Sequence, residues 1–307
     1  MSSPPQMRDR CVSRGLAVPP ELLGAMPDSA PLRDDPPALR RRLAEDGFLF
    51  LAGVLPRELV LSAREAVLRR LAAVGEVAMP IGAGRFTGTS RRRELAADLG
   101  QFWQSVSEEP RLRSLTHGPA LRAAVETVLG EPSVAHDMLF LRAGVPGRAT
   151  DLHYDCSFFA RTTERTLTAW VPLGDVPVEQ GPLMVVAGSN RFEDLIDGAR
   201  HPESGTAGRR AALEGDAASV ARSRGTRLLT RDFRAGDLVL LGMFICHGSL
   251  DHHAADNAIR LSFDLRFQPA AAPRDPRFFG PRPPGLTGRG YGELNGAKPL
   301  TEDWHQR

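Results

Sequence analysis

The sequence predicts a mixed α+β fold whose core is mainly β. Two observations carry this prediction. Helical patterns fill the first part of the chain, up to Gly130, and short apolar strands separated by glycine and proline turns follow it. Strands of this length and spacing are typical of a sandwich or a double-sheet barrel. Because the helices precede the strands, we expect them to cover the outer face of one sheet.

The helical part contains three amphipathic segments with recognisable ends. Each places apolar residues at helical spacing, and two are bounded by proline or glycine signals. The predicted helices span Ala38–Asp46, Arg57–Val74 and Pro119–Leu129, and Phe48–Leu51 is a strand between the first two. Residues 78–101 have no clear period and are expected to form a loop near a site.

The β part contains six predicted strands, interrupted by a polar insertion at 197–227 that we interpret as a lid or a long loop. The strands are Ser133–Arg142, Asp151–Phe159, Thr166–Pro172, Leu183–Val186, Asp237–His247 and Ile259–Gln268. We therefore divide the chain into a flexible arm at 1–37, one domain at 38–268 and an irregular tail at 269–307. The domain has a helical cover at 38–130 and a β core at 131–268.

Composition narrows the class of protein. Of the 307 residues 42% are hydrophobic, and the longest apolar runs are far too short to cross a membrane. A net charge of +2 gives no electrostatic basis for nucleic-acid binding. The three cysteines form no CxxC pair, and the first residues lack the apolar core of a secretion signal. We expect a cytoplasmic protein with no nucleic-acid or membrane partner, and nothing in the sequence indicates an oligomeric state.

The motif that organises the chain is His153-Tyr154-Asp155. On a strand, side chains two positions apart share a face, so His153 and Asp155 would converge on one point as two metal ligands. The pattern is common by itself. A third ligand is available in His247, which ends the apolar row of the strand predicted at Asp237–His247 and is followed at once by Gly248-Ser249. His252 and His253 are alternatives in the loop beyond.

The last predicted strand alternates strictly between a polar and an apolar face. Its polar face carries Arg260, Ser262, Asp264, Arg266 and Gln268. A half-solvated strand would give the same pattern. Arg260, however, is the thirteenth residue after His247, and a guanidinium matches a carboxylate with two parallel hydrogen bonds. With the Ser262 hydroxyl beside it, Arg260 suits the anchoring of a dicarboxylic acid.

Two histidines and one carboxylate leave three positions open on a metal, an arrangement typical of non-haem Fe(II) oxygenases. A zinc hydrolase or isomerase accepts the same ligands, but it would leave Arg260 and Ser262 without a role. A metal-free protein that only binds a small ligand is a further alternative. An iron oxygenase with an acid co-substrate accounts for all five residues.

Several motifs in order also resemble one family, the phytanoyl-CoA dioxygenase-like Fe(II)/2-oxoglutarate-dependent oxygenases. The resemblance runs from about Asp46 to Gln268. The motifs are Asp46-Gly47-Phe48 with Gly53-Val54-Leu55, His153-Tyr154-Asp155, Ala169-Trp170-Val171-Pro172-Leu173, Gly181-Pro182-Leu183 with Gly188-Ser189-Asn190-Arg191, and His247-Gly248-Ser249 with Arg260.

The resemblance implies a double-stranded β-helix, also called a jelly roll, and a set of site residues. His153, Asp155 and His247 would hold Fe(II). Arg260 would bind the distal carboxylate of 2-oxoglutarate, and Ser262, Thr168 and Trp170 would line its pocket.

The resemblance also implies the reaction. The enzyme would use O2 and 2-oxoglutarate to oxidise a C–H bond of a small organic molecule, with release of succinate and CO2. The presence of Asp155 favours hydroxylation, because related halogenases have glycine or alanine at this position. Bacterial members of the family often modify natural products or amino-acid-like solutes, so the resemblance allows a natural-product intermediate as substrate but does not identify the substrate.

Overall fold

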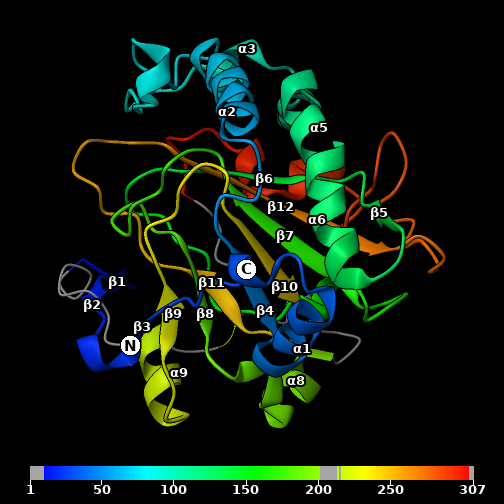
Figure 1. Ribbon diagram of the computed structural model, residues 1–307. Coiled ribbons are helices and arrows are strands. Elements are labelled where there is room, and N and C mark those ends of the chain that lie inside the picture. Colours follow the sequence, from blue (N-terminus) through cyan, green and yellow to red (C-terminus); the bar gives the residue numbers. More distant parts are fainter. Residues whose placement is uncertain (1–9, 201–212, 214–215, 304–307) are drawn as a thin grey trace.

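Two β-sheets face each other in the computed structural model, which describes residues 10–200, 213 and 216–303 (Figure 1). The larger sheet has the strand order β4-β10-β7-β12-β5, and β6 also pairs with β12. All its pairings are antiparallel. Its strands are β4 (Phe48–Leu51), β5 (Ser133–Ala135), β6 (Phe140–Gly144), β7 (Leu167–Pro172), β10 (Leu238–Gly242) and β12 (Arg260–Pro269).

The smaller sheet has the order β11-β8-β9-β3. Its strands are β3 (Leu23–Ala25), β8 (Leu183–Val186), β9 (Leu228–Thr230) and β11 (His247–Ser249). Strand β3 comes from the N-terminal region and pairs with β9 in parallel. A separate two-stranded ribbon, β1 (Val12–Ser13) with β2 (Leu16–Ala17), precedes it. The mixed architecture with mostly sheet in its core agrees with the predicted α+β class.

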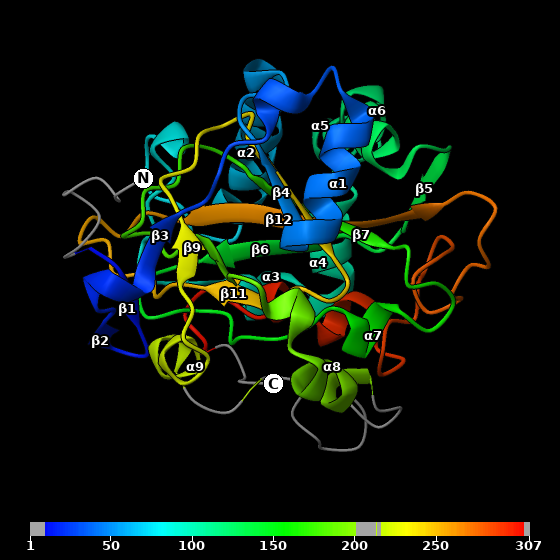
Figure 2. The same cartoon turned by 60° about the horizontal axis from the view of Figure 1, so that its bottom comes forward.

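Helices cover the outer face of the larger sheet, as predicted (Figures 1 and 2). They are α1 (Pro36–Asp46), α2 (Arg57–Ala72), α3 (Arg92–Leu95), α4 (Leu99–Ser107), α5 (Pro110–Thr116) and α6 (Pro119–Leu129). The end signals explain the bounds of α1, because the Asp35 side chain accepts from the Ala38 backbone N–H and Gly47 takes a left-handed φ of 78°. The sequence analysis did not predict α3, which lies in the expected loop at 78–101, nor α4 and α5.

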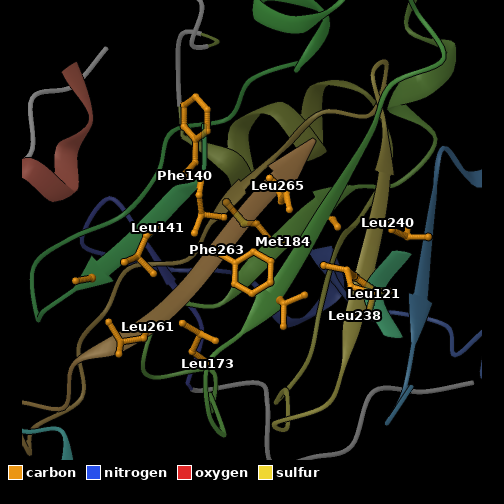
Figure 3. Packing of buried hydrophobic residues seen from close by; sticks show 14 of the residues in the cluster. Leu121, Phe140, Leu141, Leu173, Met184, Leu238, Leu240, Leu261, Phe263 and Leu265 are labelled. Carbon is orange, nitrogen blue, oxygen red and sulfur yellow. The ribbon is translucent and has the colours of Figure 1, made fainter. Parts of the chain in front are cut away.

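Two hydrophobic clusters stabilise the two faces of the larger sheet. The outer cluster joins the helices to the apolar face of β12, and Figure 3 shows Leu261, Phe263 and Leu265 of that face, with Leu238 and Leu240 of β10 farther along the same sheet. The inner cluster lies between the sheets and is formed by alternate residues of β4, β7, β8 and β10. Alternation along each strand therefore separates the outer core from the interior where the polar side chains of β12 lie.

Two of the six strand predictions were wrong at the positions that matter for the site. Residues 151–159 form no strand: His153 makes a single antiparallel bridge with His247, and the chain then enters the short helix α7 (Cys156–Phe159). The predicted strand Asp237–His247 is two strands in different sheets, β10 and β11, joined by a turn at Met243–Cys246. The predicted strand Ser133–Arg142 likewise divides into β5 and β6.

The described parts of the predicted arm and tail contain more regular structure and more buried residues than their composition indicated. The described part of the predicted arm contains β3 and the buried Cys11. The predicted irregular tail contains two single-turn 3-10 helices, Gly290–Glu293 and Asn295–Ala297, and buries Phe278 and Tyr291 in the outer cluster. These segments lack a periodic pattern because they contact the domain through isolated residues.

The polar insertion predicted at 197–227 includes the end of α8 (Glu193–Arg200) and α9 (Ala217–Ser223). Residues 201–212 and 214–215 of this insertion lie outside the described residues, and the prediction of a lid therefore stays a prediction. Among the described residues, no helix has both the length and the apolar character needed to span a membrane.

Candidate active site

Three ligand-type side chains meet between the two sheets. One potential ligand atom from each of His153, Asp155 and His247 lies within 4.8 Å of the other two. The described part of the chain contains no other such group. Nε2 of His153 lies 3.7 Å from Asp155 Oδ1, and Nε2 of His247 lies 4.0 Å from Asp155 Oδ2. The structure thus brings together the three predicted ligands, although His153 and Asp155 converge through a turn into α7 rather than along a strand.

The backbone around His247 permits this convergence. The N–H of His153 donates to the His247 carbonyl at 2.9 Å, and the N–H of His247 donates to the His153 carbonyl at 3.0 Å. At the next residue, a Cβ on Gly248 would lie 2.7 Å from the Thr150 carbonyl oxygen. Only glycine allows the two segments to approach so closely.

In both histidines Nε2 is available to ligate a metal. Nδ1 of His153 lies 2.9 Å from the Asp151 carbonyl, and Nδ1 of His247 lies 3.0 Å from the Ile245 carbonyl. A carbonyl only accepts, so each Nδ1 carries the proton and each Nε2 keeps its lone pair. Burial, with the neighbouring His247, lowers the pKa of His153 to about 3, which keeps it neutral. This donor set fits a divalent metal.

Asp155 is the most constrained member of the group. Arg266 Nη2 donates to Oδ1 at 3.1 Å and to Oδ2 at 3.2 Å, and the Thr168 hydroxyl donates to Oδ2 at 2.5 Å. Burial alone would raise the pKa of Asp155, but Arg266 and the two histidines outweigh it and hold this pKa well below its usual range. Thr168, predicted to line a co-substrate pocket, therefore contacts a predicted metal ligand directly.

A small pocket extends from the histidines along β12. It is lined by Arg142, Thr150, His153, Trp170, Leu183, His247, Gly248, Ser249, Arg260 and Asp264. The pocket therefore contains Arg260 and Trp170 as predicted. Its free volume of about 20 Å³ holds little more than one water. A dicarboxylic acid can enter only if wall side chains move.

Arg260 is buried and only partly satisfied. Its Nη1 donates to the Ser262 hydroxyl at 3.0 Å, but its Nε has no hydrogen-bond partner among the described residues. Burial, together with Arg142, lowers its pKa to about 10. The guanidinium is therefore still charged near neutral pH, and it lacks a full counter-charge. Such a group favours an anion in the pocket.

Sequence reasoning missed Arg142 and Arg266 as parts of the site. Arg142 pairs with Asp264 at 2.5 Å. It is the one charged residue of the strand Phe140–Gly144, and an isolated arginine in an apolar strand is a signal that could have found it. Arg266 was placed on the correct face of its strand, but only the pairing of Arg266 with Thr168 in the β12–β7 register locates it beside Asp155. The alternatives His252 and His253 donate to backbone carbonyls outside the group.

The sequence profile of the phytanoyl-CoA dioxygenase (PhyH) family matches residues 43–260, which is well over half of the chain. The chain belongs to the PhyH family. This PhyH chain is also 30% identical over 269 residues to 1-deoxypentalenic acid 11-beta-hydroxylase of Streptomyces arenae, covering 80% of this chain and 86% of that enzyme. The corresponding enzyme of Streptomyces exfoliatus is 29% identical over the same shares.

Solved structures agree with this membership. The epimerase SnoN in complex with Fe3+, alpha ketoglutarate and nogalamycin RO is 25% identical with a TM-score of 0.52, covering 88% of this PhyH chain and 98% of SnoN. EctD from S. alaskensis with 2-oxoglutarate and 5-hydroxyectoine has a TM-score of 0.54 at 20% identity, covering 90% of this chain and 92% of EctD, and shows a shared fold.

These findings confirm the predicted family and enzyme class. The PhyH chain is a non-haem Fe(II)/2-oxoglutarate-dependent oxygenase, and its cofactor and co-substrates are Fe(II), 2-oxoglutarate and O2.

Proposed function

We propose that this enzyme hydroxylates, or otherwise oxidises, a C–H bond of a small carboxylic acid that is an intermediate of natural-product biosynthesis. The substrate class rests on the similarity to the two Streptomyces hydroxylases, whose substrate is itself an acid. The site roles rest on one observation: three convergent metal-ligand side chains and an incompletely paired arginine share a single buried pocket.

In this proposal His153, Asp155 and His247 hold Fe(II), and Arg260 with Ser262 binds the distal carboxylate of 2-oxoglutarate. Trp170 forms a wall of that pocket. It is 2% exposed, and its ring lies 4.7 Å from that of Phe233, so the wall is rigid. Thr168 acts through Asp155. We also propose that the two facing sheets form a double-stranded β-helix and that the enzyme is cytoplasmic, which suits its free, buried cysteines.

The bound metal and 2-oxoglutarate supply the oxidising chemistry with O2. The residues of the chain orient the metal ligands and the co-substrate, and they exclude water from the site. The carbonyls of Asp151 and Ile245 fix the two imidazole rings, since each accepts the Nδ1 proton. Arg260 binds the distal carboxylate of the co-substrate and so orients it in the pocket. The apolar residues of the inner cluster keep water from the buried side of the site.

The first test is anaerobic reconstitution. Purified protein is mixed with Fe(II) and 2-oxoglutarate, and the visible charge-transfer absorption of the chelate is recorded. We expect the band in the wild type, none in His153→Ala and a weak one in Arg260→Ala. Arg69→Ala removes an exposed arginine of α2 and serves as the matched control. If the wild-type protein is correctly folded, as judged by its unfolding transition, and still shows no band, the proposal is refuted.

The second test addresses the substrate. Polycyclic and acyclic carboxylic acids are screened for substrate-dependent succinate release, and products are identified by mass spectrometry. A product heavier by one oxygen supports hydroxylation. A product of unchanged mass but inverted configuration would instead favour epimerisation, the activity named for SnoN, which shares 25% of its residues with this chain.

A further inference from the structure

Both carboxylate oxygens of Asp155 accept hydrogen bonds from the side facing β7 and β12. Thr168 donates to Oδ2, whereas Arg266 Nη2 contacts Oδ1 and Oδ2 at nearly equal distances of 3.1 and 3.2 Å. Thr168 and Arg266 are register partners on neighbouring strands, so the β12–β7 pairing fixes them relative to each other. Oδ2 therefore accepts two hydrogen bonds and Oδ1 accepts one.

Burying the charged side chain of Arg266 at this position costs free energy. It is 2% exposed, and its guanidinium lies over the rings of Phe140 and Phe159, at 4.5 and 4.0 Å from their centres. Its Nε and Nη1 have no hydrogen-bond partner in the described part of the chain. Its counter-charge is the buried Asp155 carboxylate, and taking both charges out of water costs free energy that an apolar pair of similar volume would avoid. This indicates a role beyond packing.

The position of the carboxylate shows what that role is. Oδ1 lies 3.7 Å from Nε2 of His153 and Oδ2 lies 4.0 Å from Nε2 of His247, so either oxygen, or both, could reach a metal held by the histidines. A carboxylate oxygen has two acceptor sites. The hydrogen bonds from Thr168 and Arg266 occupy those of Oδ2, and one site of Oδ1 stays free.

The number of bound oxygens matters for the reaction. If His153, His247 and one oxygen of Asp155 held a six-coordinate metal, three positions would stay open for 2-oxoglutarate and O2. A second oxygen from Asp155 would take the position that O2 requires. We propose that Arg266 and Thr168 are positioning residues that restrict Asp155 to one-oxygen coordination and so keep the O2 position open. This inference rests on the proposed roles of His153, Asp155 and His247.

The test uses nitric oxide as a probe for the O2 position. Wild-type enzyme and the variants Thr168→Val, Arg266→Met and their double variant are loaded anaerobically with Fe(II) and 2-oxoglutarate and titrated with nitric oxide, and the iron–nitrosyl signal is followed by electron paramagnetic resonance. Val matches Thr in shape, and Met fits between the two phenylalanine rings. Neither can donate a hydrogen bond to Asp155.

We expect the double variant to keep the charge-transfer band of the 2-oxoglutarate chelate but to bind nitric oxide at least about tenfold more weakly, because a second oxygen of Asp155 would then compete for the open position. Thr168→Val alone should show part of this loss. Thr230→Val is the matched control, because its buried hydroxyl donates to the Leu183 carbonyl on the smaller sheet. It should bind nitric oxide as the wild type does.

Wild-type nitric oxide affinity in the double variant would overturn the proposal, and so would loss of Fe(II) binding itself, since the pair would then serve metal affinity instead. If Arg266→Met or the double variant fails to fold, the conservative Thr168→Val decides by the same criterion. A wild type that binds neither Fe(II) nor 2-oxoglutarate would refute the proposed function, an outcome distinct from failure of this inference.

Discussion

Arg260 donates a 3.0 Å hydrogen bond from Nη1 to the hydroxyl of Ser262, while its Nε faces no acceptor in the described part of the chain. The guanidinium is thus held in place by one residue of its own strand and left with donors to spare. A preorganised, incompletely paired cation is what a carboxylate-binding site requires.

We predict that Arg260→Lys weakens 2-oxoglutarate binding by roughly ten- to a hundredfold, because hydrogen bonds to a charged group contribute about 1.5–3 kcal/mol. Lysine keeps the charge but loses the planar pair of donors. Calorimetric titration of the Mn(II)-loaded protein measures the effect. Ser262→Ala should lower the affinity less, and equal affinities for all three proteins would contradict the assignment of this pocket.

The glycine opposite Arg260 gives an independent test of the same geometry. Gly144 is the register partner of Arg260, and a Cβ at this position would lie 3.3 Å from Nη2 and 3.4 Å from Nε. Gly144→Ala should therefore displace the guanidinium slightly and raise the KM for 2-oxoglutarate with little change in thermal stability. Gly82→Ala is the control, since a Cβ added there would meet no atom within 4 Å beyond its chain neighbours. An unchanged KM in Gly144→Ala would argue against the co-substrate role of Arg260.

Metal-free protein should lose stability as the pH falls below about 6.5, the ordinary histidine value. Burial lowers the pKa of His136 and His153 to about 3 and that of His252 to about 4. Between these values and 6.5 the unfolded chain binds protons that the folded protein does not. Acid therefore favours unfolding, by about 1.4 kcal/mol per pH unit for each such histidine.

Urea unfolding of chelator-treated protein between pH 7 and pH 4.5 measures this dependence. His136→Gln removes one of the three groups without touching a proposed metal ligand, so its stability should fall less steeply with acid than that of the wild type. Parallel slopes for the two proteins would show that His136 is not buried in its neutral form.

A buried ion pair should be the main support of the C-terminal segment. Arg92 Nη2 lies 2.5 Å from Glu76 Oε2 with both side chains 0% exposed, and Arg92 Nη1 donates to the carbonyls of Gly296, Ala297 and Lys298. Glu76→Gln leaves the arginine charge buried and uncompensated, which should cost about 3–5 kcal/mol of unfolding free energy.

The control for this variant is Arg93→Gln, which breaks the exposed Arg93–Glu302 pair and should cost less than about 1 kcal/mol. Equilibrium denaturation gives both values, and limited proteolysis should cut the C-terminal segment first in Glu76→Gln. Equal stabilities of the two variants would show that the buried pair is not the anchor.

Sequence reasoning selected His153, Asp155 and His247, which the structure brings together, and Arg260, whose role stays a prediction. It was wrong about the path of the chain between 151 and 159, because His-x-Asp spacing does not distinguish a strand from a bridge followed by a turn into α7. The ligands still converge, since the contact of His153 with His247 replaces the expected strand geometry.

The environment of Asp155 could not be predicted at all. It depends on which residue of β7 faces which residue of β12, and a single sequence shows the polar face of β12 but not its partner. Buried side chains of the predicted tail were missed for a different reason. Phe278 and Tyr291 enter the core singly from proline- and glycine-rich segments, where no period reveals them.

Strand β12 pairs with β7 along one edge and with β6 and then β5 along the other. It carries Arg260 near one end and Arg266 near the other, about 20 Å apart at 3.3 Å per residue. Insertion or deletion of one residue between them would turn one of the two arginines out of the site, whichever end kept its pairing. Active variants of this enzyme should therefore not gain or lose a single residue between Arg260 and Arg266. A point substitution at either arginine would leave the other in its place.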